Sequence, residues 1–198
     1  MRSPIYKRYC LIYLLSALIV CGIANGVSAD TKVDIENLFS PSGWMGDGEY
    51  GRKYIEFSGA YQSQPHSPPG CIKITYKFGP KRWAGIYWLN KADNWGDTEG
   101  EDYSGKGISR VSFWSKGETG KEVVEFKSGG IKDRRKKFQD SFGTTTGRIS
   151  LSDKWMKYEI DLSDLKLHSV IGGFSWVASA DYNLGKGIIF YIDDIVFE

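Results

Sequence analysis

The chain has few of the residues that cross-link a fold. It holds three cysteines, and Cys10 and Cys21 lie in an N-terminal segment that we expect to be removed. Cys71 alone then remains, so no intrachain disulfide is possible, and a buried, unreactive thiol is expected. The fold must therefore rest on its apolar core, for which the remaining residues, about 169, suffice in one domain.

Residues that typically catalyse reactions are also scarce. The two histidines are His66 and His168, and neither accompanies a nucleophile signature. There is no His-Glu-x-x-His, no Cys-x-x-Cys and no glycine-rich phosphate loop, so zinc hydrolysis and nucleotide chemistry lack support. A glycosidase needs two carboxylates, and Glu125 with an acid from a neighbouring loop keeps that alternative open.

The N-terminus predicts export. Arg2, Lys7 and Arg8 precede the uncharged run "LIYLLSALIVCGIA", and small residues follow it up to Ala29. This order is typical of a secretory signal peptide over residues 1–29, cleaved before Asp30. The mature protein is then secreted or periplasmic, with no transmembrane segment. The alternative is a lipid anchor to the envelope through Cys21. Mass spectrometry of the mature N-terminus distinguishes the two.

Removal of that segment changes the charge. The chain has 26 Lys+Arg and 24 Asp+Glu, and the segment holds three of the former and none of the latter. The mature part therefore has 23 basic and 24 acidic residues, a net charge of about −1. A nucleic-acid partner loses its main support.

Short runs of alternating apolar and polar residues fill the rest of the chain. Nine such runs, from "KYIEFSG" to "GIIFYIDDIVF", are separated by Gly, Asp, Asn, Ser and Pro, and no helical period persists. This pattern predicts one all-β sandwich over residues 30–198. Long connections are expected at 40–51, 90–107 and 129–147, of which the last is strongly basic.

Aromatic residues exceed the needs of such a core. The chain has seven tryptophans, and alternation along the strands places several on the polar side. We expect Trp88, Trp155 and Trp176 to be packing residues. Exposed rings stack on the C–H faces of sugars, and nearby charged groups bond the hydroxyls. The predicted ligand-binding residues are Trp44, Trp83, Tyr87, Trp95, Trp114, Glu125 and Lys127.

Several segments resemble a known family. "WAGIYWLNKADNWG", "YSGKGISRVSFWSKGE" and the order "DLSDL…VIGGF…FYIDDIVF" are similar to carbohydrate-binding modules of the galactose-binding-like type from secreted bacterial proteins. The resemblance covers most of residues 38–198. It implies a two-sheet antiparallel jelly-roll sandwich and a polysaccharide or oligosaccharide ligand.

The resemblance also implies a structural Ca²⁺ between the N-terminal strand and the last strand. Asp193 or Asp194 in "YIDDIVF", with Asp34 or Glu36 in "VDIENLF", would supply oxygen ligands. Strand alternation predicts that the side chains of Asp193 and Asp194 point to opposite faces. A backbone or lysine hydrogen bond would satisfy a half-buried carboxylate equally well.

The sequence therefore predicts non-catalytic glycan binding by exposed aromatic residues on a β-sandwich. Two alternatives remain open. One is a jelly-roll glycoside hydrolase or polysaccharide lyase, and the other is an envelope scaffold that binds protein and not glycan.

Overall fold

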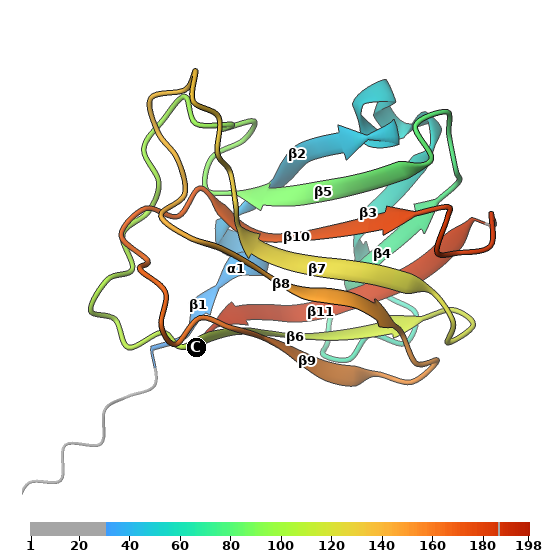
Figure 1. Ribbon diagram of the computed structural model, residues 1–198. Helices are drawn as coiled ribbons and strands as arrows, with labels where there is room; N and C mark the ends of the chain where they lie inside the picture. Colours follow the sequence, from blue (N-terminus) through green and yellow to red (C-terminus); the bar gives the residue numbers. More distant parts are fainter. Residues whose placement is uncertain (1–30, 186) are drawn as a thin grey trace, which may run out of the picture.

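The computed structural model describes residues 31–185 and 187–198 (Figure 1). The predicted signal peptide and the alternative lipidation site at Cys21 lie outside the described residues. Within these two ranges, no helix is both long enough and apolar enough to cross a membrane.

The described chain forms two antiparallel sheets packed face to face, which confirms the predicted jelly-roll sandwich (Figure 1). The six-stranded sheet has the order β3-β4-β11-β6-β9, and β1 pairs with β11. Its strands are β1 (Val33–Asp34), β3 (Ile55–Tyr61), β4 (Cys71–Tyr76), β6 (Arg110–Gly117), β9 (Met156–Asp161) and β11 (Ile188–Phe197).

The five-stranded sheet has the order β2-β5-β10-β7-β8. Its strands are β2 (Ser40–Gly46), β5 (Trp83–Leu89), β7 (Val123–Gly129), β8 (Gly143–Ser150) and β10 (Gly172–Ser179). One helical turn, α1 (Ile35–Leu38), follows β1, and a 3-10 helix, η1 (Asp47–Lys53), follows β2. The Asp34 carboxylate caps α1 by accepting a hydrogen bond from the Asn37 N–H at 3.0 Å.

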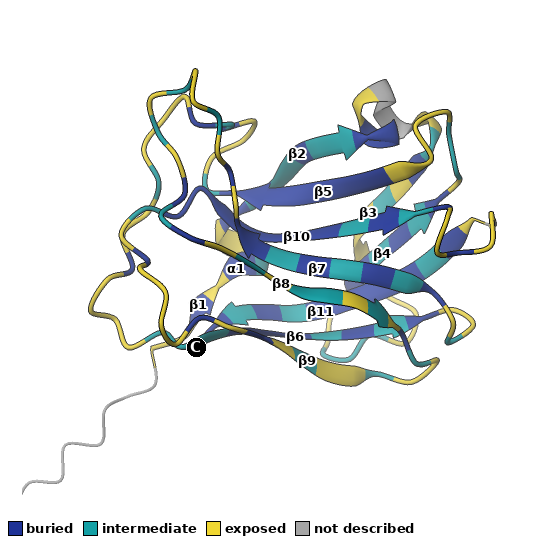
Figure 2. Cartoon of the chain, in the orientation of Figure 1, coloured by how far each residue is buried: buried dark blue, intermediate teal, exposed yellow. Residues whose placement is uncertain are grey.

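The core lies between the sheets, where strand alternation turns one side of each strand inward. Trp88 and Trp176 are buried there, as predicted, and Phe113, Phe126 and Phe174 pack around them. Figure 2 shows the central strands β5 and β10 largely buried, whereas the long loops beyond them are largely exposed. Cys71 is fully buried, so the expectation of a buried thiol is confirmed, and burial raises the pKa of that thiol to about 11.

Two expectations about the elements were wrong. Residues 40–51 were expected to form a connection, but they contain β2 and η1. Because β2 is an edge strand, it tolerates Pro41, whose nitrogen has no hydrogen to donate to a neighbouring strand. The strand β8 likewise begins at Gly143, inside the expected basic connection, so the loop between β7 and β8 is shorter than predicted.

Trp155 is a packing residue, but it does not belong to the core. It directly precedes β9 and lies half-buried on the outer side of the six-stranded sheet. Its indole N–H donates to the Gln64 carbonyl at 3.1 Å. Its ring meets the ring of His66 edge-on, with 6.0 Å between centroids.

Candidate functional site

Five of the seven predicted ligand-binding residues belong to one side of the molecule, the outer face of the five-stranded sheet. Tyr87, Lys127 and Thr145 occupy one row across the strands, because Tyr87 pairs with Ser175, Ser175 with Lys127, and Lys127 with Thr145. Residues opposed in neighbouring strands share a face. The next row in the same direction consists of Met45, Gly85, Val177, Glu125 and Arg148.

An aromatic cavity lies at the end of this face that the long loops cover. Its volume is about 420 Å³, and its lining is Met45, Tyr87, Trp95, Gly130, Ile131, Lys132 and Asp133. The rings of Tyr87 and Trp95 meet edge to face, with 5.9 Å between centroids. Gly43 leaves room for both, since a Cβ there would approach the Tyr87 Cβ to 2.7 Å.

Tyr87 is more enclosed than the sequence suggested. Only 7% of its surface is exposed, and its hydroxyl donates to the Gly129 carbonyl at 3.1 Å. The half-buried Trp95 offers more of its ring to a ligand. Tyr87 therefore forms the floor of the cavity, and Trp95 forms part of its wall.

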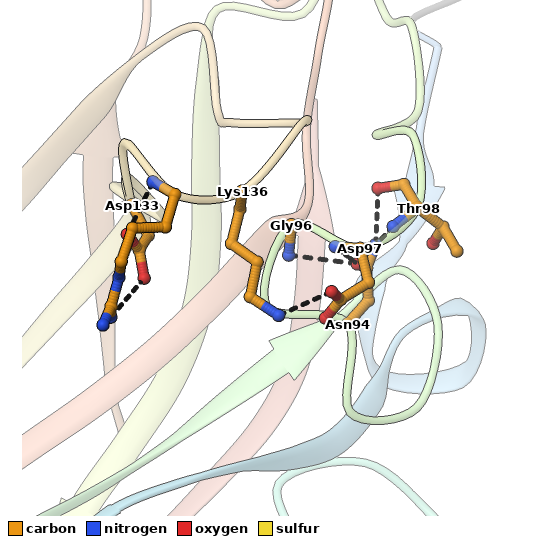
Figure 3. Close-up of polar contacts among 7 residues, drawn as sticks. Asn94, Gly96, Asp97, Thr98, Asp133 and Lys136 are labelled. Atoms are coloured by element: carbon orange, nitrogen blue, oxygen red, sulfur yellow. Dashed lines mark hydrogen bonds and ion pairs between the residues drawn. The ribbon is translucent and has the colours of Figure 1, made fainter.

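Asn94 shapes the loop that positions Trp95. Its side-chain oxygen accepts hydrogen bonds from the backbone N–H groups of Gly96, Asp97 and Thr98 at 3.0–3.1 Å (Figure 3). Such side-chain turns are typical of asparagine. The Lys136 ammonium then bonds Asp97 at 2.5 Å and joins this loop to the basic loop between β7 and β8 (Figure 3).

The buried side chain of Asp140 holds that basic loop in place. Its carboxylate accepts backbone hydrogen bonds from Ile131, Ile171 and Gly172 at 2.5–3.2 Å. Burial raises the pKa of Asp140 to about 6, although the three N–H groups oppose that rise. The carboxylate thereby fixes Ile131 against the aromatic cavity.

Glu125 and Lys127 form the polar middle of the face. Their charged groups lie 3.2 Å apart, and the Glu125 carboxylate also accepts a hydrogen bond from the Thr145 hydroxyl at 2.7 Å. Burial alone would raise the pKa of Glu125, but the Thr145 and Lys127 contacts outweigh it and lower the pKa. Glu125 is therefore an ionised hydrogen-bond acceptor at neutral pH.

The far end of the face holds Trp83. It lies four residues before Tyr87 on the same side of β5, which is a distance of roughly 13 Å along the strand. Its side chain is 38% exposed. On the edge strand β8 of the same sheet, the Arg148 guanidinium stacks over the Tyr182 ring at 3.8 Å.

The structure does not bring Trp44 and Trp114 to this face. Trp44 lies opposite Ile86 on β5 and turns inward, where it packs against the core and meets Phe57 edge-on. Trp114 lies on the six-stranded sheet. The ring of His66 stacks on it with 3.8 Å between centroids and 16° between planes, so one face of the indole is covered.

The predicted metal ligands do meet, in an acidic pocket on the six-stranded side. Asp34, Glu36, Asp193 and Asp194 line a cavity of about 290 Å³. The expectation that Asp193 and Asp194 point to opposite faces was wrong. Asp194 has a φ of 53° at a bulge in β11, which interrupts the alternation and leaves both carboxylates at the same pocket.

The charges in this acidic pocket are not balanced by lysine or arginine. Among the described residues, its four carboxylates form one ion pair, from Asp194 to His66 at 2.7 Å. Asp193 accepts a hydrogen bond from the Ser67 N–H at 2.9 Å. Burial, followed by repulsion from Asp193, Asp34 and Asp194, raises the pKa of Glu36 to about 7.

Ser67, His66 and Asp194 lie together without forming a catalytic triad. The Ser67 hydroxyl and the Asp194 carboxylate both contact the same ring nitrogen, Nδ1 of His66, at 3.2 and 2.7 Å. A triad histidine uses one nitrogen for the serine and the other for the carboxylate.

Sequence reasoning missed several residues of these sites. Asn94 could have been found, since Asn before Trp-Gly in a polar loop indicates a side-chain turn. Asp140 and His66 gave no signal, because the contacts of Asp140 with Ile131 and Ile171, and of His66 with Asp194, join residues at least nine positions apart in the chain.

The sandwich is the β-jelly-roll fold of carbohydrate-binding modules. The sequence itself matches no protein-family model and no curated protein.

Among similar solved structures is the family 30 carbohydrate-binding module of the cellulosomal cellulase Cel9D-Cel44B of Clostridium thermocellum. It is 15% identical, with a TM-score of 0.56 over 85% of this chain and 97% of that one. The family 11 module of the cellulosomal cellulase Lic26A-Cel5E from the same organism gives 13% identity and a TM-score of 0.52, covering 85% and 95%. A family 11 module was also solved with a β-1,3-1,4-mixed-linked tetrasaccharide. At these identities the likeness shows the fold, and the ligand must be argued from the site.

Proposed function

We propose that this protein binds a polysaccharide or oligosaccharide, without catalysis, on the outer face of the five-stranded sheet. The main support is the aromatic cavity of Tyr87 and Trp95 beside the polar pair Glu125 and Lys127. Rings accept the C–H faces of a sugar, and fixed charged groups bond its hydroxyls. Trp83 extends the same face, so an oligosaccharide has room to lie along β5. The proposal includes export, on the strength of the predicted signal peptide.

The carboxylates favour binding over hydrolysis. The general acid of a glycosidase needs a raised pKa, whereas the pKa of Glu125 is lowered, so Glu125 does not suit the role of that acid. Asp47, one acid that might have partnered it, is buried and accepts a hydrogen bond from the Tyr76 hydroxyl at 2.6 Å. Asp97 is engaged with Lys136. These partners give Asp47 and Asp97 structural roles.

A glycan array with the mature protein, including mixed-linked β-glucan, tests this function. We expect retention on at least one glycan and no release of reducing sugar. Trp95→Ala should weaken binding roughly tenfold, since a stacked ring contributes about 0.5–1.5 kcal/mol. Trp114→Ala is the matched control, because it removes an indole from the other sheet outside this site, and it should leave this affinity unchanged.

Three outcomes would contradict the proposal. Release of sugar that Glu125→Gln abolishes would indicate an enzyme. Retention on no glycan would favour a scaffold that binds protein. Equal affinities of Trp95→Ala and the unmodified protein would show that the glycan does not bind at the cavity.

We also propose a structural Ca²⁺ in the acidic pocket, held by Asp34, Glu36 and Asp193 with Asp194. Clustered carboxylates without lysine or arginine partners suit a hard cation. Saturation to 100 times Kd should stabilise the fold by about 2.7 kcal/mol. Thermal unfolding with calcium and with chelator measures this, and Glu36→Gln should reduce the difference. Identical melting curves under the two conditions would show that no structural Ca²⁺ stabilises the fold.

A further inference from the structure

The outer side of the six-stranded sheet presents a row in which lysines and aromatic rings alternate. Lys73 on β4, Tyr191 on β11 and Lys116 on β6 are directly opposed in register. Tyr61, at the end of β3, and Trp155, before β9, flank them. We call these five residues the lysine–aromatic face. It lies on the opposite sheet from the cavity of Tyr87 and Trp95.

The two ammonium groups of this face are held by rings and not by carboxylates. Lys73 Nζ lies 4.5 Å from the centroid of the Tyr61 ring and 5.7 Å from that of Tyr191. Lys116 Nζ lies 4.9 Å from the Tyr191 centroid and 5.5 Å from that of Trp155. Neither lysine forms an ion pair with any described residue. Each ammonium has three donors, and a ring face attracts its charge without using them all.

The rings are fixed in place before any ligand arrives. Tyr191 is only 5% exposed, and its hydroxyl donates to the Glu118 carboxylate at 2.5 Å. The indole N–H of Trp155 donates to the Gln64 carbonyl. A ligand would therefore meet an ordered surface, which lowers the entropic cost of binding.

We propose that the lysine–aromatic face is a second binding surface and that its ligand is an acidic polysaccharide. A sugar carboxylate would lie between the ammonium groups of Lys73 and Lys116 and accept hydrogen bonds from both. The two residues are two strand spacings apart, roughly 10 Å between their backbones. Tyr61 and Trp155 would contact the C–H faces of the neighbouring sugars. Two unpaired cations between rings complement a carboxylated sugar better than a neutral one. This inference goes beyond the proposed function, because it uses none of the residues of that site.

Affinity electrophoresis of the mature protein in gels containing polygalacturonate tests this surface, with neutral galactan as the uncharged probe. The double variant Lys73→Met/Lys116→Met keeps the aliphatic stems on the rings and removes both charges. We expect it to lose about tenfold or more in affinity for polygalacturonate. Lys73→Arg/Lys116→Arg should stay near the unmodified protein, and added salt should weaken binding.

Each outcome distinguishes this surface from the first. Trp95→Ala should leave polygalacturonate binding intact. If Trp95→Ala abolishes it and the double methionine variant does not, the acidic glycan binds at the cavity, and this inference fails while the proposed function stands. Equal retention of the methionine variant and the unmodified protein also overturns it. Equal binding to polyglutamate would show a general anion surface and overturn the saccharide assignment.

Discussion

The two outer faces of the sandwich use similar residue types in different ways. On the five-stranded sheet, Glu125 is paired with Lys127 and Asp97 with Lys136, and Lys132 at the cavity is a lining cation without an ion pair among the described residues. On the six-stranded sheet, Lys73 and Lys116 lie against rings and form no ion pair with an acid among the described residues. Paired charges suit the hydroxyls of a neutral sugar, whereas unpaired cations suit an anion.

Each face is also partly covered by a loop, and each loop is anchored by a buried acid. On the five-stranded side, Asp140 satisfies its carboxylate with three backbone N–H groups. On the six-stranded side, Asp193 and Asp194 hold the loop at His66 and Ser67, and Glu36 lies beside them with repelling neighbours. The first anchor is one carboxylate surrounded by N–H groups, whereas the second brings four carboxylates together with one ion pair among the described residues, to His66. The second therefore has a reason to recruit a cation.

The largest expected effect on stability comes from removing the carboxylate of Asp140. Asp140→Ala leaves three buried N–H groups without an acceptor, which should lower the free energy of unfolding by about 3 kcal/mol. The melting midpoint should fall by about 6–12 °C, as measured by thermal unfolding. Glycan affinity should fall with it, because Ile131 loses its position beside the cavity.

His66→Ala is the corresponding change on the other side. It removes the stack on Trp114, and we expect a loss of about 1 kcal/mol with unchanged affinity at the cavity. If the two variants destabilise the protein equally, the contrast between the two anchors is false.

The sequence predicted the sandwich better than it predicted the sites. All nine alternating runs lie in strands, since alternation records directly which side of a strand faces the core. The inward positions of Trp88 and Trp176 followed from the same pattern. The edge strand β2 was not predicted, because glycine and proline, which normally indicate turns, are tolerated in an edge strand.

The sites depend on which sheet each strand joins, and alternation does not contain that information. Trp83 and Tyr87 were placed together correctly, because they share one strand. Trp114 has the same local pattern, but β6 belongs to the other sheet. The contact of His66 with Asp194 joins residues 128 positions apart, so only the fold reveals it.

The pH dependence of stability sharpens the comparison of the two anchors. Glu36 has a folded pKa of about 7 against an ordinary value of 4.5, and Asp140 has about 6 against 3.8. A raised folded pKa gives stability that is complete below the unfolded value and is lost as pH rises through the folded value. Without metal, unfolding should therefore become easier between about pH 4 and pH 7 on account of both acids.

Calcium should separate the two contributions. With chelator, the stability of Glu36→Gln relative to the unmodified protein should increase by about 1–2 kcal/mol between pH 5 and pH 8. This figure allows for solvent screening of a half-buried group. Calcium should remove that penalty at Glu36, because the ion compensates the carboxylate. It should leave the Asp140 contribution in place, because backbone N–H groups already occupy those oxygens. Chemical unfolding at pH 5 and pH 8 measures both contributions to the free energy of unfolding. If the difference in stability between Glu36→Gln and the unmodified protein does not change with pH, the neighbouring carboxylates do not raise the pKa of Glu36.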